Sequence, residues 1–552
     1  MSGAPNNQTF DPITLEIYWN RLISIADEAA TGLLRTAFST IVRESNDYAN
    51  VVMDRNGDSI AENTGGLASF SCILAKTTKV FLEKYPAETW KPGDTAITND
   101  PWLATGHLPD FTVVTGIFQD GKLVGFAGSV AHSPDVGGSL WSADCRELFE
   151  EGIRIPPTKL LHAGVWNEQL LDIFLGNVRV PRQVLGDLQA QVSANEVAAR
   201  RVVEFLDDTG LDDLRSLSVA LHERTDRAMR QAIREVPDGT YKAEISADGF
   251  DEQVTRIVCA VTVKGDTMHI DYEGTSPQID RGINCVMNYT HAYSVYPVKC
   301  ALDPFTPRNE GSYRAITVSA PTRSILNPVY PAPVSARQLT GHLLAGAVYK
   351  ALAPVLPDKV IAECGGAPTM RALFSGFNHD GDRFSQVLFA SGGMGAAPHK
   401  DGMSTTAFPT NVGAGSIEAF ESIAPLVIWK KQFLTDSGGA GAFRGGLGQE
   451  IEIEVRTKDA IRLSLLSDRH QHPAEGLAGG QSGSPSMIAF ADGSRPHPKS
   501  RTAIAPNDRL TMHYAGGGGY GDPKKRSREA VKSDVENGYV SPEAAAKIYG
   551  VK

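Results

Sequence analysis

The chain has 552 residues, enough for several hydrophobic cores at the usual size of roughly one domain per 150 residues. Its hydrophobic fraction of 41% and charged fraction of 21% are those of an ordinary globular protein, which excludes a disordered chain. The net charge of -11 at pH 7 disfavours a nucleic-acid-binding surface, because contacts to phosphate need clustered Lys and Arg.

Cysteine usage and the first residues indicate the compartment. The six cysteines are scattered and include no C-x-x-C pair, which fits a reducing environment and disfavours a disulfide framework or a thiolate zinc site. The opening segment MSGAPNNQTFDP has neither the basic nor the apolar region of a signal peptide, and no apolar stretch reaches membrane-spanning length. We therefore expect a cytoplasmic protein that binds no membrane.

The first 138 residues are expected to form one helix followed by strands. Asp11 is placed to cap a helix that begins at Pro12 and ends near Thr40, with an apolar stripe at three- and four-residue spacing. Residues 48–62 are expected to form a hairpin about Asn56-Gly57. Residues 111–118 and 122–131 are expected to form a second hairpin about Asp120-Gly121.

The rest of the chain alternates between helical and strand patterns. Residues 165–235 are expected to be helical, 237–330 mainly strands, 336–353 helical and 448–515 strands, with a glycine-rich region at 391–447 and two short helices in the tail. The run Gly516 to Gly519 is interpreted as a flexible turn rather than an anion site. The fold class is therefore α+β, a mixed multidomain architecture with four expected units: 1–235 with a metal site, 236–440, 441–522 and 523–552.

Two copies of His-x-Pro-Asp lie at the open end of the second hairpin, at residues 107–110 and 132–135. If a three-residue turn closes the hairpin, Asp110 faces His132 and His107 faces Asp135. Directly opposed residues have Cβ atoms roughly 4.5–5.5 Å apart, so the four side chains are expected to converge. Imidazole and carboxylate ligands suit Zn, Mn, Fe or Co.

The alternative interpretation is that these are loop histidines and turn aspartates that satisfy backbone groups. We prefer that interpretation for either motif alone, and the metal site for the mirrored pair. The segment from Glu44 to Asp47 is a further source of a carboxylate. His470 and His472 are interpreted as part of a surface or interface loop rather than as a second metal site. The chain has no Walker A loop and no G-x-S-x-G elbow.

Several longer segments carry a family resemblance. They are DPITLEIYWNRL near the start, RESNDYANVVMD at 43–54, NDPWLATGHLPD at 99–110, AHSPDVGG at 131–138, EGIRIPP at 151–157, YEGTSPQIDRGIN at 272–284, GGAGAFRGGLG at 438–448 and the closing GGGGYGDP. As a set, these segments show that the chain resembles the hydantoinase B/oxoprolinase family over nearly its whole length.

The resemblance implies the B-type component of an ATP-dependent cyclic amide hydrolase. In that family an ATP-binding A-type component phosphorylates the amide oxygen, while the B-type component carries a divalent metal and completes hydrolysis. The implied metal ligands are Asp47, His107, Asp110 and His132. Asp135, placed to orient a histidine or water, and Glu44 are the candidate catalytic carboxylates. The expected assembly is a heterotetramer or larger, and the expected substrate is a hydantoin, a lactam or 5-oxoproline.

Two other functions remain open from the sequence. A subunit of an acetone or acetophenone carboxylase would use a related metal site to bind an activated enol and CO₂ or bicarbonate. The acetone carboxylase counterpart is longer, so the length of this chain favours the hydrolases. A non-enzymatic scaffold subunit is the third possibility, and the intact HLPD and HSPD motifs count against it.

Overall fold

The first helix begins where the sequence predicts. In the computed structural model, which describes residues 10–251, 253–368 and 370–551, the Asp11 carboxylate accepts hydrogen bonds from the N–H groups of Ile13 and Thr14, both at 3.0 Å. These bonds cap α1 (Pro12–Thr36). The helix ends four residues earlier than expected, and a separate turn, α2 (Thr40–Arg43), follows it.

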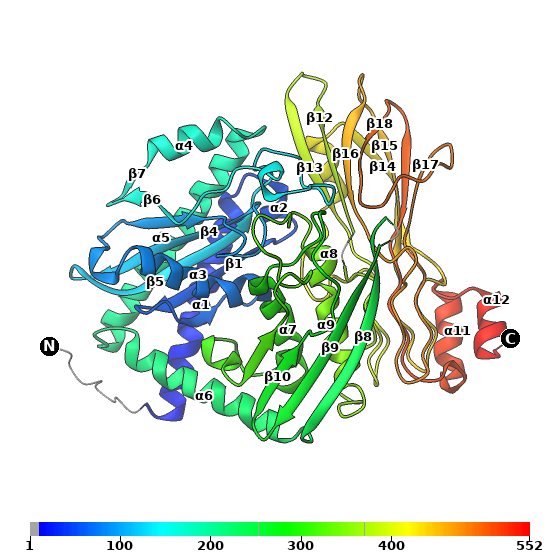
Figure 1. Cartoon of the computed structure of the whole chain (residues 1–552), viewed down its shortest axis with the longest axis horizontal. Helices are drawn as coiled ribbons and strands as arrows, with labels where there is room; N and C mark the ends of the chain where they lie inside the picture. Colours follow the sequence, from blue (N-terminus) through cyan, green and yellow to red (C-terminus); the bar gives the residue numbers. More distant parts are fainter. Residues whose placement is uncertain (1–9, 252, 369, 552) are drawn as a thin grey trace.

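A seven-stranded antiparallel sheet with the strand order β2-β1-β5-β4-β3-β6-β7 forms the N-terminal part of the molecule (Figure 1). Its strands are β1 (Tyr48–Asp54), β2 (Ser59–Glu62), β3 (Thr95–Thr98), β4 (Asp110–Gln119), β5 (Lys122–His132), β6 (Thr158–His162) and β7 (Val165–Trp166). Both predicted hairpins are therefore confirmed, β1 with β2 and β4 with β5.

Helices cover both faces of this sheet, which is why its strands are almost wholly buried. On one face, Val52 packs in a core with residues of α1 and α5 (Pro181–Thr209). On the other face, Val51 and Met53 pack with residues of α3 (Ala68–Lys84). The expectation of strands throughout 40–138 was wrong for α3, because that helix is buried around much of its circumference and shows no clean helical stripe.

A second sheet, in the order β11-β10-β9-β8, lies beyond a layer of helices. Its strands are β8 (Gly239–Phe250), β9 (Gln253–Lys264), β10 (Thr267–Asp271) and β11 (Ile316–Ser319). The helices are α6 (Arg215–Arg234), α7 (Met287–Leu302), α8 (Gln338–Gly341) and α9 (Leu343–Leu352). The sequence indicated strands where α7 forms. One hydrophobic core joins Val113 of the first sheet to Val261 and Leu343, and so crosses the expected boundary at 235/236.

Two four-stranded sheets make a β-sandwich at the side of this assembly (Figure 1). One sheet runs β13-β12-β16-β18 and the other β14-β15-β19-β17. Strand β12 pairs with β16, so residues from both sides of the expected boundary at 440/441 share a sheet. The strands are β12 (Arg371–Phe377), β13 (Arg383–Phe389), β14 (Leu426–Phe433), β15 (Gln449–Val455), β16 (Ile461–Leu466), β17 (Met487–Phe490), β18 (Arg501–Ile504) and β19 (Arg509–His513).

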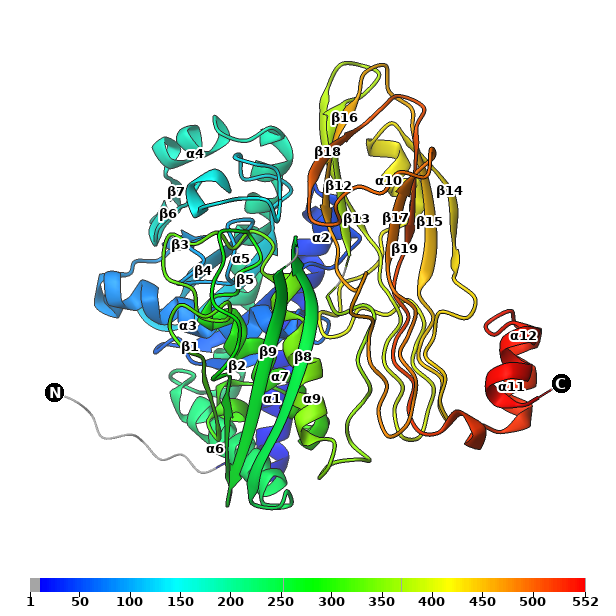
Figure 2. The same ribbon diagram turned by 45° about the vertical axis from the view of Figure 1, so that its right-hand side comes forward.

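Below the sandwich, extended glycine-rich segments run side by side, joined by backbone hydrogen bonds (Figure 2). The N–H of Gly446 donates to the carbonyl of Met394 at 2.8 Å, and the N–H of Gly517 donates to the carbonyl of Gly446 at 2.9 Å. A Cβ on Gly446 would lie 2.0 Å from the oxygen of Met403, so only glycine fits there. The interpretation of residues 516–519 as a flexible turn was wrong, because these glycines are packed inside this bundle.

The C-terminal tail forms the two short helical units that its Pro and Gly residues predict. They are η4 (Pro523–Lys525) with α11 (Arg528–Glu536), and α12 (Pro542–Ala544) with the π-helical turn η5 (Ala545–Tyr549). Buried Arg526 pairs with Asp534 of α11 at 2.7 Å inside the tail, and it joins the tail to the glycine-rich bundle through Asp401 at 2.6 Å. The remaining elements are η1 (Ala87–Thr89), η2 (Leu148–Glu150), α4 (Glu168–Leu175), η3 (Glu310–Tyr313) and α10 (Ile417–Ile423).

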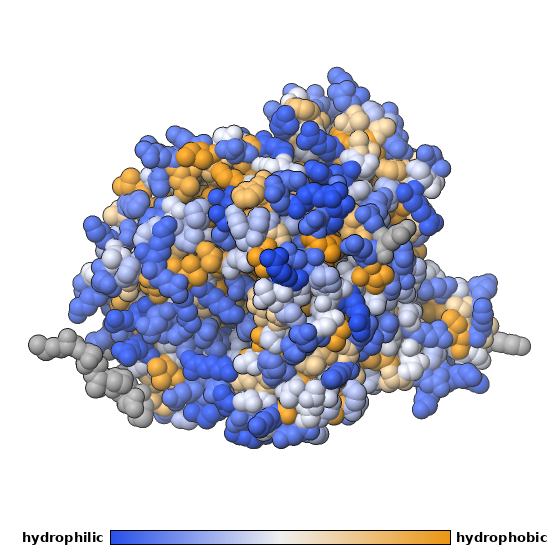
Figure 3. Space-filling model, viewed as in Figure 1, coloured by the Kyte–Doolittle hydropathy of each residue, from blue (hydrophilic) through white to orange (hydrophobic). Residues whose placement is uncertain are grey.

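The outer surface fits this layered arrangement. On the face drawn in Figure 3, hydrophilic residues predominate and hydrophobic residues form small groups, one of them over the region of α4. None of the helices described here combines the length and the apolar character that crossing a bilayer requires.

Candidate metal centre

The register of the second hairpin brings the two motifs together. Asp110 at the start of β4 pairs with His132 at the end of β5, as predicted. The turn itself differs from the prediction: Gln119 pairs with Lys122, so the loop has two residues, and a β-bulge after Ile117 compensates for the shorter turn. Both loop residues have positive φ, 49° at Asp120 and 76° at Gly121.

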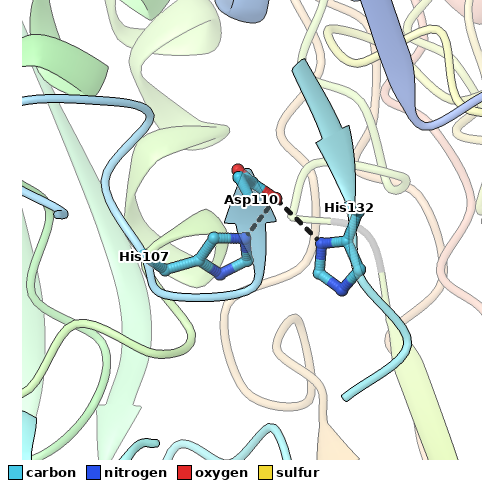
Figure 4. Close-up of side chains that lie close together, drawn as sticks. All are labelled: His107, Asp110 and His132. Atoms are coloured by element: carbon cyan, nitrogen blue, oxygen red, sulfur yellow. Dashed lines mark hydrogen bonds and ion pairs between the residues drawn. The ribbon is translucent and has the colours of Figure 1, made fainter. Parts of the chain in front are cut away.

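Asp110 lies between two imidazoles (Figure 4). Its Oδ1 is 2.8 Å from Nε2 of His107 and 2.9 Å from Nδ1 of His132. All three residues are at most 3% exposed. Their ligand atoms lie within 4.8 Å of one another, and in the described part of the chain no other group of three or more His, Cys, Asp or Glu residues meets this condition.

The tautomer of His107 shows that this group is suited to a cation. Its Nδ1 is 2.9 Å from the carbonyl oxygen of Ser335, which can only accept, so Nδ1 carries the proton. Burial lowers the pKa of His107 to about 4, which keeps the imidazole neutral. Nε2 therefore presents a lone pair to Asp110 Oδ1, and two acceptors at 2.8 Å are stabilised by a cation bound between them. The donor set fits a divalent metal.

Arg337 fixes the other oxygen of Asp110. Its Nη2 donates to Asp110 Oδ2 at 2.5 Å and its Nε donates to the carbonyl of Thr105 at 2.6 Å. The guanidinium also stacks on the ring of Tyr289, 4.0 Å from its centroid. Burial by itself raises the pKa of Asp110, but the buried Arg337 guanidinium and the hydrogen bond with His132 hold that pKa well below its usual range. Asp110 is therefore a charged carboxylate with both oxygens oriented.

Glu151 holds the segment that carries Ser335 and Arg337. Its Oε1 accepts from the N–H groups of Val334 and Ser335 at 2.5 and 2.8 Å. The carbonyl of Ser335 in turn accepts from Trp141 Nε1 at 2.7 Å as well as from His107. Burial raises the pKa of Glu151 to about 8. This carboxyl group is thus linked to His107 and Asp110 through the backbone of residues 334–337.

The three donors open on a cavity of about 30 Å³ at the junction of the first sheet, the helical layer and the β-sandwich. Asp47 lines the same cavity, but its carboxylate lies outside the group of three. Burial raises the pKa of Asp47, and its backbone carbonyl accepts from the N–H of His132 at 3.1 Å. The other lining residues are Leu67, Phe70, Trp141, Tyr289, Tyr293, Arg337, Gln338, His342, Arg371, Thr410 and Val412.

The two candidate catalytic carboxylates lie elsewhere. The expected contact of His107 with Asp135 was wrong, because strand pairing ends at Asp110 and the chain then turns away. Asp135 instead accepts from Arg179 Nη1 at 2.6 Å and from the N–H of Gly137 at 3.1 Å. Glu44 follows α2 and lines a separate cavity with residues of β13 and α10. Neither carboxylate lines the cavity beside His107, Asp110 and His132.

Several cavity residues were not found from the sequence. Arg337 and Gln338 had a local signal, since they interrupt an apolar run between Val334 and Leu352. Tyr289 and Tyr293 had none, because they lie in α7, which was not predicted. His470 and His472 behave as expected for an interface loop: His472 Nδ1 is 3.0 Å from Asp248 Oδ1 of β8, and His470 contacts Ser467.

The fold and the site together define a class: α+β proteins with a buried His–Asp–His centre between a helix-covered antiparallel sheet and a β-sandwich. The same fold occurs in the ATP-dependent caprolactamase from Pseudomonas jessenii, with a TM-score of 0.91, 28% identity and coverage of 99% of this chain and 97% of that chain. A nucleotide-free acetone carboxylase shares the fold with a TM-score of 0.89, 21% identity and coverage of 98% and 79%.

Residues 11–523 match the family described as Hydantoinase B/oxoprolinase, and the chain belongs to that family. It is 32% identical to the beta chain of the caprolactamase of Pseudomonas jessenii, over 98% of this chain and 96% of that protein. It is 30% identical to the putative B component of a D-/L-hydantoinase from Pseudomonas sp. strain NS671, over 98% and 95%. It is also 26% identical to 5-oxoprolinase 1 of Arabidopsis thaliana, over 93% of this chain and 42% of that protein.

Proposed function

We propose that the chain is the metal-carrying subunit of an ATP-dependent hydrolase of cyclic amides, working with a separate A-type, ATP-binding subunit. The observation that carries this proposal is the buried group of His107, Asp110 and His132. It is supported by relatives at 30% and 32% identity that are named as subunits of a hydantoinase and a caprolactamase. The proposed substrate is a small hydantoin, lactam or 5-oxoproline.

In this proposal His107, Asp110 and His132 hold a divalent ion, and Asp47 supplies a further carboxylate from the same cavity. Nitrogen and oxygen donors of this kind suit Zn, Mn, Fe or Co. When bound, such an ion supplies Lewis-acid chemistry and makes a water acidic near neutral pH. Asp135 and Glu44 do not line the cavity, so we assign them no direct contact with the substrate.

The surrounding residues have distinct roles. Arg337 keeps Asp110 charged and oriented, and the backbone of Ser335 fixes the tautomer of His107. The apolar side chains of Leu67, Phe70 and Val412 exclude bulk water from the cavity. A low dielectric strengthens the electrostatic contacts of the reacting group.

In this proposal the A-type partner binds ATP and uses it to activate the substrate. An amide carbonyl is a poor electrophile, and phosphorylation of its oxygen in the A-type subunit turns that oxygen into a leaving group. Hydrolysis then takes place beside the metal donors of this chain. The names of the two relatives, each one component of a larger enzyme, support a partner, and a heterotetramer or larger assembly is the expected form.

The test is reconstitution of the chain with its A-type partner. ATP turnover and ring opening would be measured on hydantoin, 5-oxoproline and ε-caprolactam, each with and without bicarbonate. We expect ATP-dependent ring opening of at least one of them without bicarbonate. Turnover that strictly requires bicarbonate would favour the carboxylase alternative, and ring opening by the chain alone without ATP would contradict the partner.

A further inference from the structure

Gln338 is a buried polar side chain with no hydrogen-bond partner in the part of the chain that the structure describes. It is the first residue of α8, follows Arg337 directly, lines the cavity beside the metal donors and is 4% exposed. Among the described residues, neither its Oε1 nor its Nε2 has a hydrogen-bond partner. An unsatisfied buried polar group costs about 1–3 kcal/mol, so a carboxamide with both atoms free is a site where a ligand is expected.

Other polar groups around the cavity are engaged with one another. The hydroxyl of Tyr289 is 3.1 Å from His342 Nε2, and the hydroxyl of Tyr293 is 3.2 Å from Ser69 Oγ. Arg337 donates to Asp110 and Thr105. Gln338, beside His107, Asp110 and His132, therefore still offers both a hydrogen-bond donor and a hydrogen-bond acceptor.

A ring-constrained amide has the complementary arrangement. An open-chain secondary amide is trans, with its N–H and C=O pointing in opposite directions, and the cis form costs about 2.5–4 kcal/mol. A small ring holds the amide cis, so its N–H and its oxygen lie on the same side. One carboxamide can bond both atoms of a cis amide at once, but not both atoms of a trans amide. A nitrogen-protonated, O-phosphorylated amide keeps the same N–H beside an oxygen.

We infer that Gln338 recognises the cyclic amide, with Nε2 donating to the substrate oxygen and Oε1 accepting from the ring N–H. This inference rests on the proposed function for the substrate class and adds the residue that selects a ring over an open chain. The ion pair of Arg337 with Asp110, at 2.5 Å, places Gln338 next to the metal donors. A cavity of about 30 Å³ is too small for a whole ring, so the cavity must widen when the substrate binds.

The experiment compares wild type with Gln338→Met in the complete enzyme with its A-type partner. Calorimetry would measure binding of hydantoin, 5-oxoproline and ε-caprolactam, and then of the N-methyl derivative and the open-chain analogue of the ring that wild type binds best. We expect Gln338→Met to bind that ring about 10- to 100-fold more weakly, the loss of two hydrogen bonds of about 0.5–1.5 kcal/mol each. We also expect the preference for ring N–H over N-methyl to disappear, while metal content stays unchanged.

Thr112→Val is the matched control. Thr112 Oγ1 is also buried and unpartnered within the described structure, and it lies on β4 two residues from Asp110, but it does not line the cavity. We expect ring binding by Thr112→Val to equal that of wild type. Gln338→Glu, which retains an acceptor but lacks the donor, should also lose ring binding and guards against an effect of misfolding in Gln338→Met.

The outcomes separate the two proposals. Equal ring binding by wild type and folded Gln338→Met, with the N-methyl preference intact, overturns the role of Gln338 and leaves the proposed function standing. If wild type with its partner binds none of the three rings, the proposed function fails, and the role of Gln338 falls with it. A parallel loss in Thr112→Val would also overturn the inference, because the effect would then not belong to the cavity.

Discussion

At the scale of single residues, Asp110 is held at both of its carboxylate oxygens. One of its oxygens contacts two imidazoles, the other accepts from a buried guanidinium, and the residue is fully shielded from solvent. A carboxylate in this position is stable only while its positive partners remain, because an unpaired buried charge costs several kcal/mol. Hairpin register predicted the pairing of Asp110 with His132. No sequence pattern predicted the contact with Arg337, which is 227 residues away.

Arg337→Met tests this dependence. The variant leaves Asp110 Oδ2 without its cation, so we expect the free energy of unfolding to fall by about 3–5 kcal/mol. We also expect metal affinity to fall by about 10- to 100-fold, as for other residues that orient a ligand. Urea unfolding and metal titration would measure the two effects.

Arg526→Met is the control for Arg337→Met. Arg526 is also a buried arginine, paired with Asp534 at 2.7 Å, but it belongs to the tail and not to the cavity. It should lower stability and leave metal affinity unchanged. Equal metal affinity in Arg337→Met and wild type would show that Arg337 serves the fold alone.

At the scale of elements, one buried carboxyl group helps to position the segment from Val334 to Arg337. Glu151 accepts two backbone N–H bonds from it, and the same segment supplies the carbonyl that orients His107. Because burial raises the pKa of Glu151 from its ordinary 4.5 to about 8, the folded chain holds a proton that the unfolded chain releases. Stability should therefore fall as pH rises from about 4.5 to 8.

Glu151→Gln should remove this component of the pH dependence. The amide keeps an oxygen for the N–H groups of Val334 and Ser335 and cannot ionise. Since one pKa unit corresponds to about 1.4 kcal/mol, the variant should gain on the order of 2–3 kcal/mol relative to wild type between about pH 5.5 and 7.5. Urea unfolding at the two pH values measures it, and parallel pH profiles for the two proteins would contradict the account.

The glycine-rich bundle packs so closely that it leaves no room for a side chain at positions such as Gly446. Gly446→Ala would place a Cβ 2.0 Å from the carbonyl oxygen of Met403, which is backbone and cannot rotate away. We expect a loss of about 3 kcal/mol or more, or no folded protein. Gly32→Ala, in α1 with nothing within 4 Å of the new Cβ, should instead gain up to about 1 kcal/mol. Thermal unfolding of both variants distinguishes packing from a general intolerance of alanine.

Elements were predictable from the sequence where the pattern that marks them lies within a few residues. The hairpins β1–β2 and β4–β5 were predictable because a turn dipeptide and strand patterning lie within a few residues of each other. The helices α3 and α7 were not, because burial on many sides removes the polar face that marks a helix. The pairing of Asp110 with His132 was predictable although the turn was shorter than expected, because a β-bulge compensated for the missing residue.

At the scale of the whole molecule, the site exists only in the assembled chain. The cavity takes Asp47 from the start of the first sheet, Tyr289 from α7, Gln338 from α8 and Arg371 from the β-sandwich. Sequence reasoning reached the residues on one hairpin, together with Asp47 through the family resemblance. It could not reach the others, because no short-range pattern relates segments that meet only through packing of three layers.

Metal analysis of the purified protein tests whether His107, Asp110 and His132 bind a metal. We expect close to stoichiometric divalent metal in wild type and a large loss in the double variant His107→Ala/His132→Ala. His472→Ala, outside the cavity, should retain the metal of wild type. Equally little metal in wild type and the double variant, after purification without chelator and incubation with Zn, Mn, Fe or Co, would contradict the account.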